Sequence, residues 1–287
     1  MDAKLAICSL TLLILLGSSA ENGEIMTKPR AHDHNAHQDI RIEQVHSHSS
    51  SHMHHMDPSV IVFFFSEDLK QGNTMPIYFP KRELSDTSHH LLPKEEADSI
   101  PFSSEKLTYL LKLFSLSENS PQAIAMEDTL RQCETDTIEG ETKLCATSYE
   151  SMLDFAKSIL GSKTEIEILS TSPLTRSGSD LLQKYTIMGI REIKAPKTVS
   201  CHTMPYPYAI FYCHYQESEN RVYKVSLTGE NGDKVEAVAV CHMDTSHWSR
   251  NHVAFQVLGI EPGSSSVCHF FPADNFVLVP STSLVHA

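Results

Sequence analysis

The chain has 287 residues, a mass of 32.1 kDa and a formal net charge of −13 at pH 7. This length suffices for one large domain or two small ones, and a content of 40% hydrophobic and 21% charged residues is ordinary for a globular protein. The negative charge argues against a nucleic-acid partner, because no basic stripe offsets it.

Residues 1–20 predict a signal peptide. Lys4 supplies the positive charge, residues 5–16 form the apolar stretch, and the small residues up to Ala20 suit cleavage. The alternatives are a membrane anchor and a buried helix, but the apolar run is too short to span a bilayer. No later segment approaches a spanning length, so we expect a protein of the secretory pathway without a membrane span.

Residues 21–57 are polar and rich in histidine, and they contain no Phe, Tyr, Trp or Cys. A segment with so little apolar surface is expected to be disordered on its own. Its imidazoles are suited to weak chelation of Cu²⁺, Zn²⁺ or Ni²⁺. The alternative is a neutral, hydrophilic spacer.

Ordered structure is expected from about residue 60. The stretch 60–80 predicts a strand, a turn at Gly72 and Asn73, and a second strand. Three helices are then predicted, at 103–116, 123–133 and 147–161. In the first, apolar residues share one face: Leu107, Leu110, Leu111 and Phe114. In the third, Thr147 and Glu150 have the spacing of a capping box, and Gly161 suits the end of the helix.

From about residue 163 the pattern becomes that of β-strands. Six segments have strand length and are enriched in β-branched or aromatic residues: 164–169, 184–190, 208–215, 221–227, 234–242 and 252–260. The sequence "TGENGDK" at 228–234 suits a hairpin turn. The predicted fold class is therefore α+β, with a helix-rich N-terminal half followed by an antiparallel β-rich C-terminal half.

Removal of the signal peptide leaves six cysteines, and an even number in an oxidising compartment favours disulfides. The candidates are Cys133, Cys145, Cys201, Cys213, Cys241 and Cys268. Six cysteines allow 15 pairings, and their spacing does not choose among them. Cys133 and Cys145 flank an acidic loop between two predicted helices, where a local disulfide is favoured over two free thiols.

Four cysteines in the C-terminal half are each followed directly by a histidine. These Cys–His pairs are separated by 10, 26 and 25 residues, which does not match a zinc finger or ribbon. On a strand, successive side chains point to opposite faces, so the cysteines can cross-link strands while the histidines converge on the other face. Converging neutral imidazoles suit copper or zinc better than calcium or magnesium. The alternative is that each histidine only makes a hydrogen bond.

Two residues that follow the third Cys–His pair are weaker candidates for the site. Asp244 is predicted as a carboxylate that orients a ligand imidazole, and His252 as a second supporting residue. The alternative for both is a solvated or merely hydrogen-bonded side chain. Trp248, the only tryptophan, is expected in the core.

The array C-H-x10-C-H-x26-C-H-x25-C-H resembles the signature of the plant BURP-domain family. Further motifs are also similar to that family: "FFFSEDL", "MPIYFP", "ADSIPFSSEKL", "CATSYESMLDF", "CHTMPYPYAIFYCH", "VAVCHMDTSHW" and "VCHFFP". The resemblance covers about residues 60–280 and is strongest to the "unknown seed protein" and metal-stress branch. It implies a BURP domain at 58–282, a destination in the cell wall or the vacuole, and copper candidates at His202, His214, His242 and His269.

The resemblance does not imply one single activity, because members of the family differ. Some BURP proteins are copper-dependent cyclases that cross-link Tyr or Trp in an attached peptide. Here residues 21–57 and the C-terminal tail lack both aromatics, so action on a separate peptide is the only cyclase hypothesis kept. The leading hypothesis is a copper-binding protein, with zinc as the second metal, that acts in seed development or stress response. The third is an interaction protein of the cell wall, with a wall polymer as partner and no metal.

Overall fold

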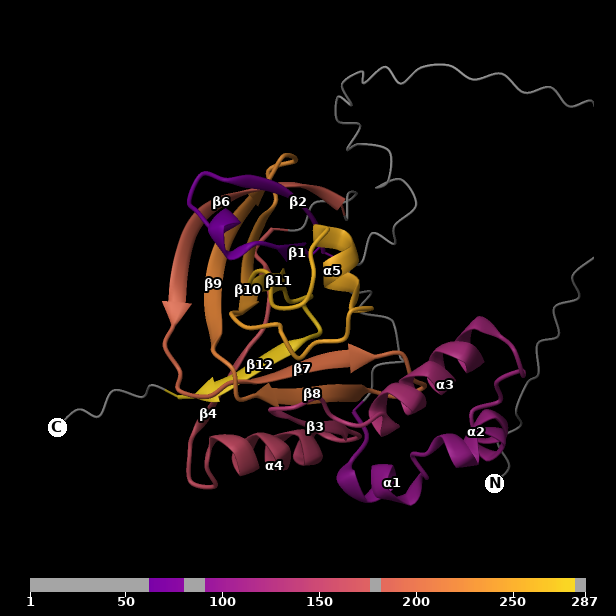
Figure 1. The fold of residues 1–287 in the computed structure, drawn as a ribbon. Helices are drawn as coiled ribbons and strands as arrows, with labels where there is room; N and C mark the ends of the chain where they lie inside the picture. Colours follow the sequence, from indigo (N-terminus) through magenta and orange to yellow (C-terminus); the bar gives the residue numbers. More distant parts are fainter. Residues whose placement is uncertain (1–61, 80–90, 176–181, 282–287) are drawn as a thin grey trace, which may run out of the picture. The chain divides into compact units, whose positions relative to one another are not determined.

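The structure, a computed structural model, describes residues 62–79, 91–175 and 182–281 (Figure 1). The predicted signal peptide and histidine-rich segment lie outside these ranges. Within them, no helix is long and apolar enough to cross a membrane. The described part consists of two antiparallel β-sheets and five α-helices.

The larger sheet has seven described strands in the order β1-β11-β10-β9-β6-β2, with β5 paired to β10. Its strands are β1 (Phe63–Phe64), β2 (Thr74–Tyr78), β5 (Ser172–Pro173), β6 (Leu182–Ile193), β9 (Asn220–Gly229), β10 (Lys234–His242) and β11 (Val267–Phe270). The predicted hairpin turn is confirmed between β9 and β10, where Gly232 adopts a φ of +86° that favours glycine.

The smaller sheet has five described strands in the order β3-β8-β7-β12-β4. They are β3 (Glu141–Ala146), β4 (Ile166–Leu169), β7 (Val199–Met204), β8 (Ile210–Gln216) and β12 (Phe276–Pro280). The chain passes repeatedly between the two sheets, from β6 to β7, from β8 to β9 and from β11 to β12. Each Cys–His pair lies on a strand, two pairs in each sheet.

Four helices precede the second half of the chain: α1 (Lys94–Ser99), α2 (Leu107–Leu113), α3 (Pro121–Glu134) and α4 (Tyr149–Leu160). The capping box of α4 is shifted by one residue from the prediction. Ser148 is the N-cap and exchanges hydrogen bonds with Ser151, because its hydroxyl lies 3.1 Å from the Ser151 amide. Gly161 ends the helix as predicted, with a φ of +115°.

The expected division into a helix-rich first half and a β-rich second half is only partly confirmed. Both sheets are antiparallel and dominate the fold, but β1, β2 and β3 come from the first half of the chain and are built into these sheets. The prediction of a helix-rich N-terminal half is therefore wrong. Long-range strand pairing, rather than local pattern, placed β1 against β11 and β2 against β6.

The strand predicted at 252–260 is also wrong, because this segment is helix α5 (Val253–Leu258). His252 caps its N-terminus by accepting the Ala254 amide hydrogen at Nδ1, and Gly259 ends it in the left-handed conformation. Ala254 and Phe255 are buried together on one side. The β-branched residues Val253 and Val257 suggested a strand, but the two end signals and this packing decide for helix.

Apolar packing on three faces positions the two sheets. A cluster drawn from both sheets fills the space between them and contains Leu169, Val222, Val238, Val240, Phe271, Val277 and Val279. Helix α4 covers the other face of the smaller sheet through Met152, Phe155 and Ala156 (Figure 1). The other face of the larger sheet forms a core of its own, in which side chains of β1, β2 and β6 pack against those of β9, β10 and β11 of the same sheet. Each sheet therefore packs against the other sheet with one face and against a separate apolar core with its opposite face.

Candidate metal centre

Two disulfides join neighbouring strands at the Cys–His pairs. Cys201 on β7 lies directly opposite Cys213 on β8, and Cys241 on β10 lies opposite Cys268 on β11. Their Cα atoms are 4.0 and 3.9 Å apart, and each pair is bonded. Each disulfide therefore ties together two adjacent strands of one sheet.

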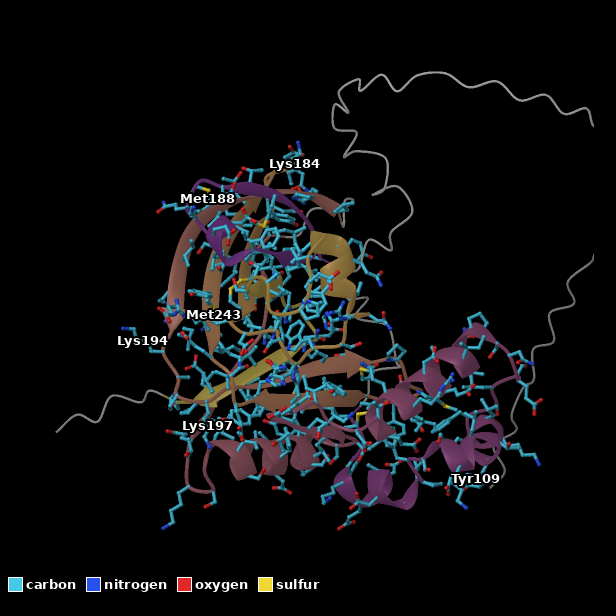
Figure 2. The ribbon with its side chains drawn as sticks, viewed as in Figure 1. Tyr109, Lys184, Met188, Lys194, Lys197 and Met243 are labelled. Carbon is cyan, nitrogen blue, oxygen red and sulfur yellow. A yellow bond between two sulfur atoms is a disulfide. The ribbon has the colours of Figure 1, made fainter. Side chains whose placement is uncertain are left out.

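The third disulfide, Cys133–Cys145, is the local bridge that the sequence predicted. Its setting differs from the prediction, because Cys145 belongs to strand β3 and not to a loop between two helices. The bridge ties the end of α3 to the edge strand of the smaller sheet. Figure 2 shows the side chains, with sulfur in yellow.

The cysteines and the histidines lie on opposite faces of their sheets. Cys201 and Cys213 are buried with the α4 side chains, on the outer face of the smaller sheet. Cys241 is buried on the outer face of the larger sheet, whereas Val240 belongs to the cluster between the sheets. Because side chains alternate along a strand, the histidine after each cysteine is directed to the space between the sheets.

There the four imidazoles come together as one group, called here the four-histidine cluster: His202, His214, His242 and His269. Within each sheet the Nε2 atoms of the two rings are 3.4 Å apart, His202 to His214 and His242 to His269. Between the sheets, the ring centroids are 5.7 Å apart for His202 and His269 and 6.4 Å for His214 and His242. The two halves of the cluster face each other across the interface.

Three polar side chains contact the outer nitrogens of these rings. Asn220 Oδ1 lies 2.6 Å from His242 Nδ1, and Asn275 Nδ2 lies 3.2 Å from His202 Nδ1. Glu141 Oε1 lies 3.2 Å from His214 Nδ1, although the angles of this contact fall outside those of a hydrogen bond. These three residues come from β9, the β11–β12 connection and β3. No motif in the sequence pointed to them, because their only relation to the histidines is spatial.

Burial lowers the pKa of three of the four imidazoles in the cluster. Desolvation, followed by the neighbouring imidazoles, holds the pKa of His202 and that of His242 well below the ordinary value of 6.5. The same causes lower the pKa of His269 to about 3, although a backbone hydrogen bond with Phe270 opposes them. Neutral imidazole is the form that binds a metal ion. These three imidazoles therefore offer lone pairs to a cation without first losing protons at neutral pH.

The weaker candidates are placed differently from the cluster. Asp244 is exposed and accepts the Ser246 amide hydrogen, and the structure gives it no contact with a cluster imidazole among the described residues. His252 caps α5, and its ring centroid lies 4.5 Å from that of Trp248, with the two rings tilted by 47°. Trp248 is half-buried, and its ring centroid lies 4.8 Å from that of His242. The side chains that contact the outer nitrogens of the cluster are those of Asn220, Asn275 and Glu141.

The nitrogen separations within the cluster resemble those of a metal site in part. Two nitrogens bound to one ion at about 2.0–2.1 Å in a tetrahedron are roughly 3.3–3.4 Å apart. Each Nε2 pair within a sheet has this separation. Across the described ranges, however, no three His, Cys, Asp or Glu side chains already stand in the arrangement of a complete metal site. Imidazole donors are of the kind that late transition metals prefer, but the two pairs are not gathered around one point in this structure.

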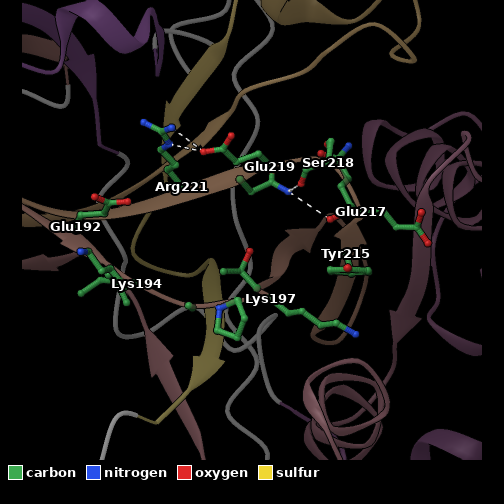
Figure 3. A pocket seen from close by; sticks show the side chains of 14 residues that line it. Glu192, Lys194, Lys197, Tyr215, Glu217, Ser218, Glu219 and Arg221 are labelled. Atoms are coloured by element: carbon green, nitrogen blue, oxygen red, sulfur yellow. Dashed lines mark hydrogen bonds and ion pairs between the residues drawn. The ribbon is translucent and has the colours of Figure 1, made fainter.

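A cleft of about 440 Å³ lies beside the cluster (Figure 3). It is lined by residues 192–198 and 215–221, which form the β6–β7 and β8–β9 connections between the sheets and the strand ends next to them. Arg221 pairs with Glu219 on one side, and Lys197 lies 5.5 Å from the Tyr215 ring on the other. Asn220 belongs to the cleft and also contacts His242, so the cleft and the cluster share one side chain.

Comparison with known proteins identifies the family. A family model described as the BURP domain matches residues 62–280. The chain is 46% identical over 228 residues to the BURP domain-containing protein BNM2A of Brassica napus, over 78% of this chain and 80% of that protein. Its identity to BURP domain protein USPL1 of Arabidopsis thaliana is 44% (78% of this chain, 81% of that protein), and to BURP domain protein RD22 of the same plant 42% (78% and 56%). The chain belongs to the BURP-domain family.

Proposed function

We propose that this BURP-domain protein binds copper in the four-histidine cluster and acts, in the cell wall or the vacuole, in seed development or in the response to stress or metal. The observation that carries the proposal is the meeting of four imidazoles from two sheets, with Nε2 atoms 3.4 Å apart in each sheet. Two disulfides, Cys201–Cys213 and Cys241–Cys268, join the pairs of strands that carry these histidines.

Copper is the favoured metal because the donors are imidazoles alone. Imidazole suits copper and zinc, and for the same site the affinity for Cu²⁺ exceeds that for Zn²⁺. Bound copper would add one-electron redox chemistry, which zinc lacks. The protein's own part is to exclude water from the cluster and to hold the rings from outside, through Asn220, Asn275 and Glu141. Zinc remains the second metal of the proposal.

The compartment and the biological role rest on separate grounds. Three disulfides support a secretory route, because disulfides persist in oxidising compartments. The role in seeds or stress rests on the resemblance to the "unknown seed protein" branch. Relatives such as USPL1 and RD22 place the chain in the same family.

Metal analysis of the purified protein tests copper binding. The histidine-rich segment is a competing chelator, so its eight histidines before residue 56 are replaced by serine in the test protein. We expect one tightly bound copper per chain, which disappears when His214 and His242 are both replaced by Gln. A correctly folded test protein that takes up no copper would overturn the proposal and favour a cell-wall interaction protein without metal.

The cleft favours a second candidate function, the copper-dependent oxidation of Tyr or Trp in a separate peptide. A peptide bound in the cleft along residues 215–221 would contact Asn220, and the side chain of Asn220 also contacts His242 of the cluster. The test incubates the copper-loaded protein with a varied set of Tyr- and Trp-containing peptides under oxygen. Oxidative cross-linking removes two hydrogens, so a mass loss of two hydrogens is expected in at least one peptide. Unchanged masses across the set, with copper bound, would remove this candidate.

A further inference from the structure

The second half of strand β6 is an open edge of the larger sheet. β9 pairs with β6 along most of its length, but β2 pairs with it only at residues 182–186. The chain before β2 adds two contacts, because the Ile187 N–H donates to the Asn73 carbonyl at 2.9 Å and the Gly72 N–H donates to the Ile187 carbonyl at 2.8 Å. Beyond them no described strand pairs with this side of β6, and Figure 1 shows this half of β6 at the margin of the sheet. We call this margin, residues 188–193, the β6 edge.

Two residues of the β6 edge direct both of their backbone groups away from β9. Along an antiparallel strand, successive residues point their N–H and C=O groups alternately to one neighbour and to the other. Ile187 points to the β2 side, and the bulge at Met188 shifts the alternation by one residue. Ile190 and Glu192 therefore present their N–H and C=O groups at the open edge. Such a row of unpaired groups is a template for a further strand.

Exposed apolar side chains accompany these backbone groups. Met188 is 53% exposed and Ile190 is 36% exposed. Ile190 lies opposite Val225, which is buried in the core on the outer face of the larger sheet. Ile190 thus continues this core at its margin, where no described strand covers it. A strand added along the β6 edge would bury both exposed side chains, which favours its association.

Two charges give the β6 edge a preference for one partner sequence. Arg191 lies opposite Lys224 on β9, so an acidic side chain is favoured on its open side, because like charges directly opposite each other are destabilising. Glu192 is exposed and lies opposite the uncharged Tyr223, so a basic side chain is favoured beside it. An antiparallel partner therefore fits when a basic, an acidic and an apolar residue follow one another, opposite Glu192, Arg191 and Ile190.

A second copy of this chain does not fit the β6 edge. Two such edges can pair in antiparallel orientation only through Ile190 and Glu192, which offer the backbone groups. Pairing Ile190 with Glu192 sets the two Arg191 side chains opposite each other, and pairing the two Glu192 residues opposes two carboxylates. Pairing the two Ile190 residues extends each strand onto Ile187, a position that Asn73 already occupies. The occupant is therefore a different chain.

We propose that the β6 edge binds an extended segment of a different protein by strand addition, with basic, acidic and apolar residues in the order given above. The backbone of the segment pairs with Ile190 and Glu192, and its apolar side chains cover Met188 and Ile190. A longer segment continues from the β6 edge into the cleft, because Glu192 and Ile193 also line the cleft. No residue of the β6 edge belongs to the four-histidine cluster, so the inference does not depend on copper.

The probe is the capped peptide Thr-Lys-Glu-Val-Thr-Val, titrated into the metal-free, full-length protein labelled with ¹⁵N. Its Lys, Glu and first Val lie opposite Glu192, Arg191 and Ile190 in the proposed register. We expect saturable binding that shifts the amide signals of Ile190 and Glu192 and slows their exchange with solvent. The amide of Arg191, which is directed to β9, should be protected with and without the peptide. Absence of binding, or binding that leaves the exchange of Ile190 and Glu192 unchanged, would overturn the inference.

N-methylated peptides separate strand addition from adsorption to the apolar side chains. In the proposed register the amide of the first Val faces the β6 edge, whereas the amide of the Glu faces solvent. Methylation of the Val amide should weaken binding at least about tenfold, and methylation of the Glu amide less than about threefold. The two peptides have the same composition and charge. Equal losses in both would contradict strand addition.

A charge reversal tests the preferred partner sequence. The double variant Arg191→Glu/Glu192→Lys should bind the peptide in which Lys and Glu are exchanged more tightly than the original peptide, and the wild-type protein should show the opposite preference. Both side chains are exposed, so the fold should be kept, which circular dichroism checks. The same preference in both proteins would overturn the charge pattern. All these titrations use metal-free protein, so their result is independent of whether the four-histidine cluster binds copper.

Discussion

Cys241 and Cys268 lie directly opposite each other on two antiparallel strands, and the histidines that follow them bring their Nε2 atoms within 3.4 Å. In an antiparallel pair, the residues after two opposed positions are diagonal neighbours on the other face of the sheet. The same relationship joins Cys201 and Cys213 to His202 and His214. Each Cys–His dipeptide thus combines a cross-link on one face with half of an imidazole pair on the other.

This relationship predicts that loss of the Cys241–Cys268 disulfide weakens both stability and copper binding. Replacing both cysteines by Ser should lower the free energy of unfolding by about 2–4 kcal/mol, because the unfolded chain gains freedom. It should also weaken copper binding, since β10 and β11 lose the bond that fixes their register. Denaturant unfolding and copper titration measure the two effects.

The Cys133–Cys145 disulfide is the control for this experiment. It lies at the edge of the smaller sheet and joins no pair of cluster strands. Replacing these two cysteines by Ser should lower stability by a similar order, about 2–4 kcal/mol, while copper binding is largely kept. Equal loss of copper in both double variants would contradict a specific role of the Cys–His register.

The metal-free protein is predicted to lose stability as the pH falls below about 6.5. The pKa of His269 is lowered to about 3 in the folded state, and those of His202 and His242 are also lowered. Below pH 6.5 the unfolded state therefore binds protons that the folded state does not, so acid favours unfolding. Each such histidine adds up to about 1.4 kcal/mol per pH unit to the slope.

Denaturant unfolding at several values between pH 7.5 and pH 4 measures this slope. The variant His269→Gln, which cannot take up the proton, should show a shallower slope than the wild-type protein. The stability of the wild-type protein is expected to be independent of these histidines above pH 7.5, because they are then neutral in both states. A stability that rises on acidification from pH 6.5 would show that the cluster is not neutral when folded.

Trp248 is predicted to report copper binding directly. It is the only tryptophan in the chain, and its ring centroid lies 4.8 Å from that of His242. Cu²⁺ in the cluster should quench its fluorescence strongly, whereas Zn²⁺, which has no redox chemistry, should quench it little. The variant His242→Gln is the control and should abolish the quenching at low copper concentration. Quenching that persists in this variant but vanishes when the N-terminal histidines become Ser would place the metal elsewhere.

His252 is predicted to act as a helix cap and not as a metal ligand. Its Nδ1 accepts the Ala254 amide hydrogen at the start of α5. His252→Ala should lower the free energy of unfolding by about 1 kcal/mol, and His252→Asn should restore it, because Asn caps helices well. Copper affinity should be unchanged in both variants. A loss of copper in both, with stability restored in His252→Asn, would make His252 part of the site.

Local sequence pattern was sufficient for several elements of this protein. The helix that Gly161 ends, the hairpin at 228–234 and the Cys133–Cys145 bridge are all present where the sequence predicted them. These features depend on residues close together in the chain, where capping, turn formation and short loop closure operate. Local pattern misled at 252–260, because two β-branched residues outweighed the end signals of a short helix.

The sequence alone shows that each histidine directly follows a cysteine, which on a strand places the two side chains on opposite faces. Which strands pair, and so which cysteines bond and which imidazoles meet, depends on tertiary packing. It also brought Glu141, Asn220 and Asn275 to the outer nitrogens of three rings. These contacts span 22 to 73 residues of chain, and no local preference encodes them. They exist because burial of apolar side chains packs the two sheets face to face. The polar groups that become buried in this interface then contact one another.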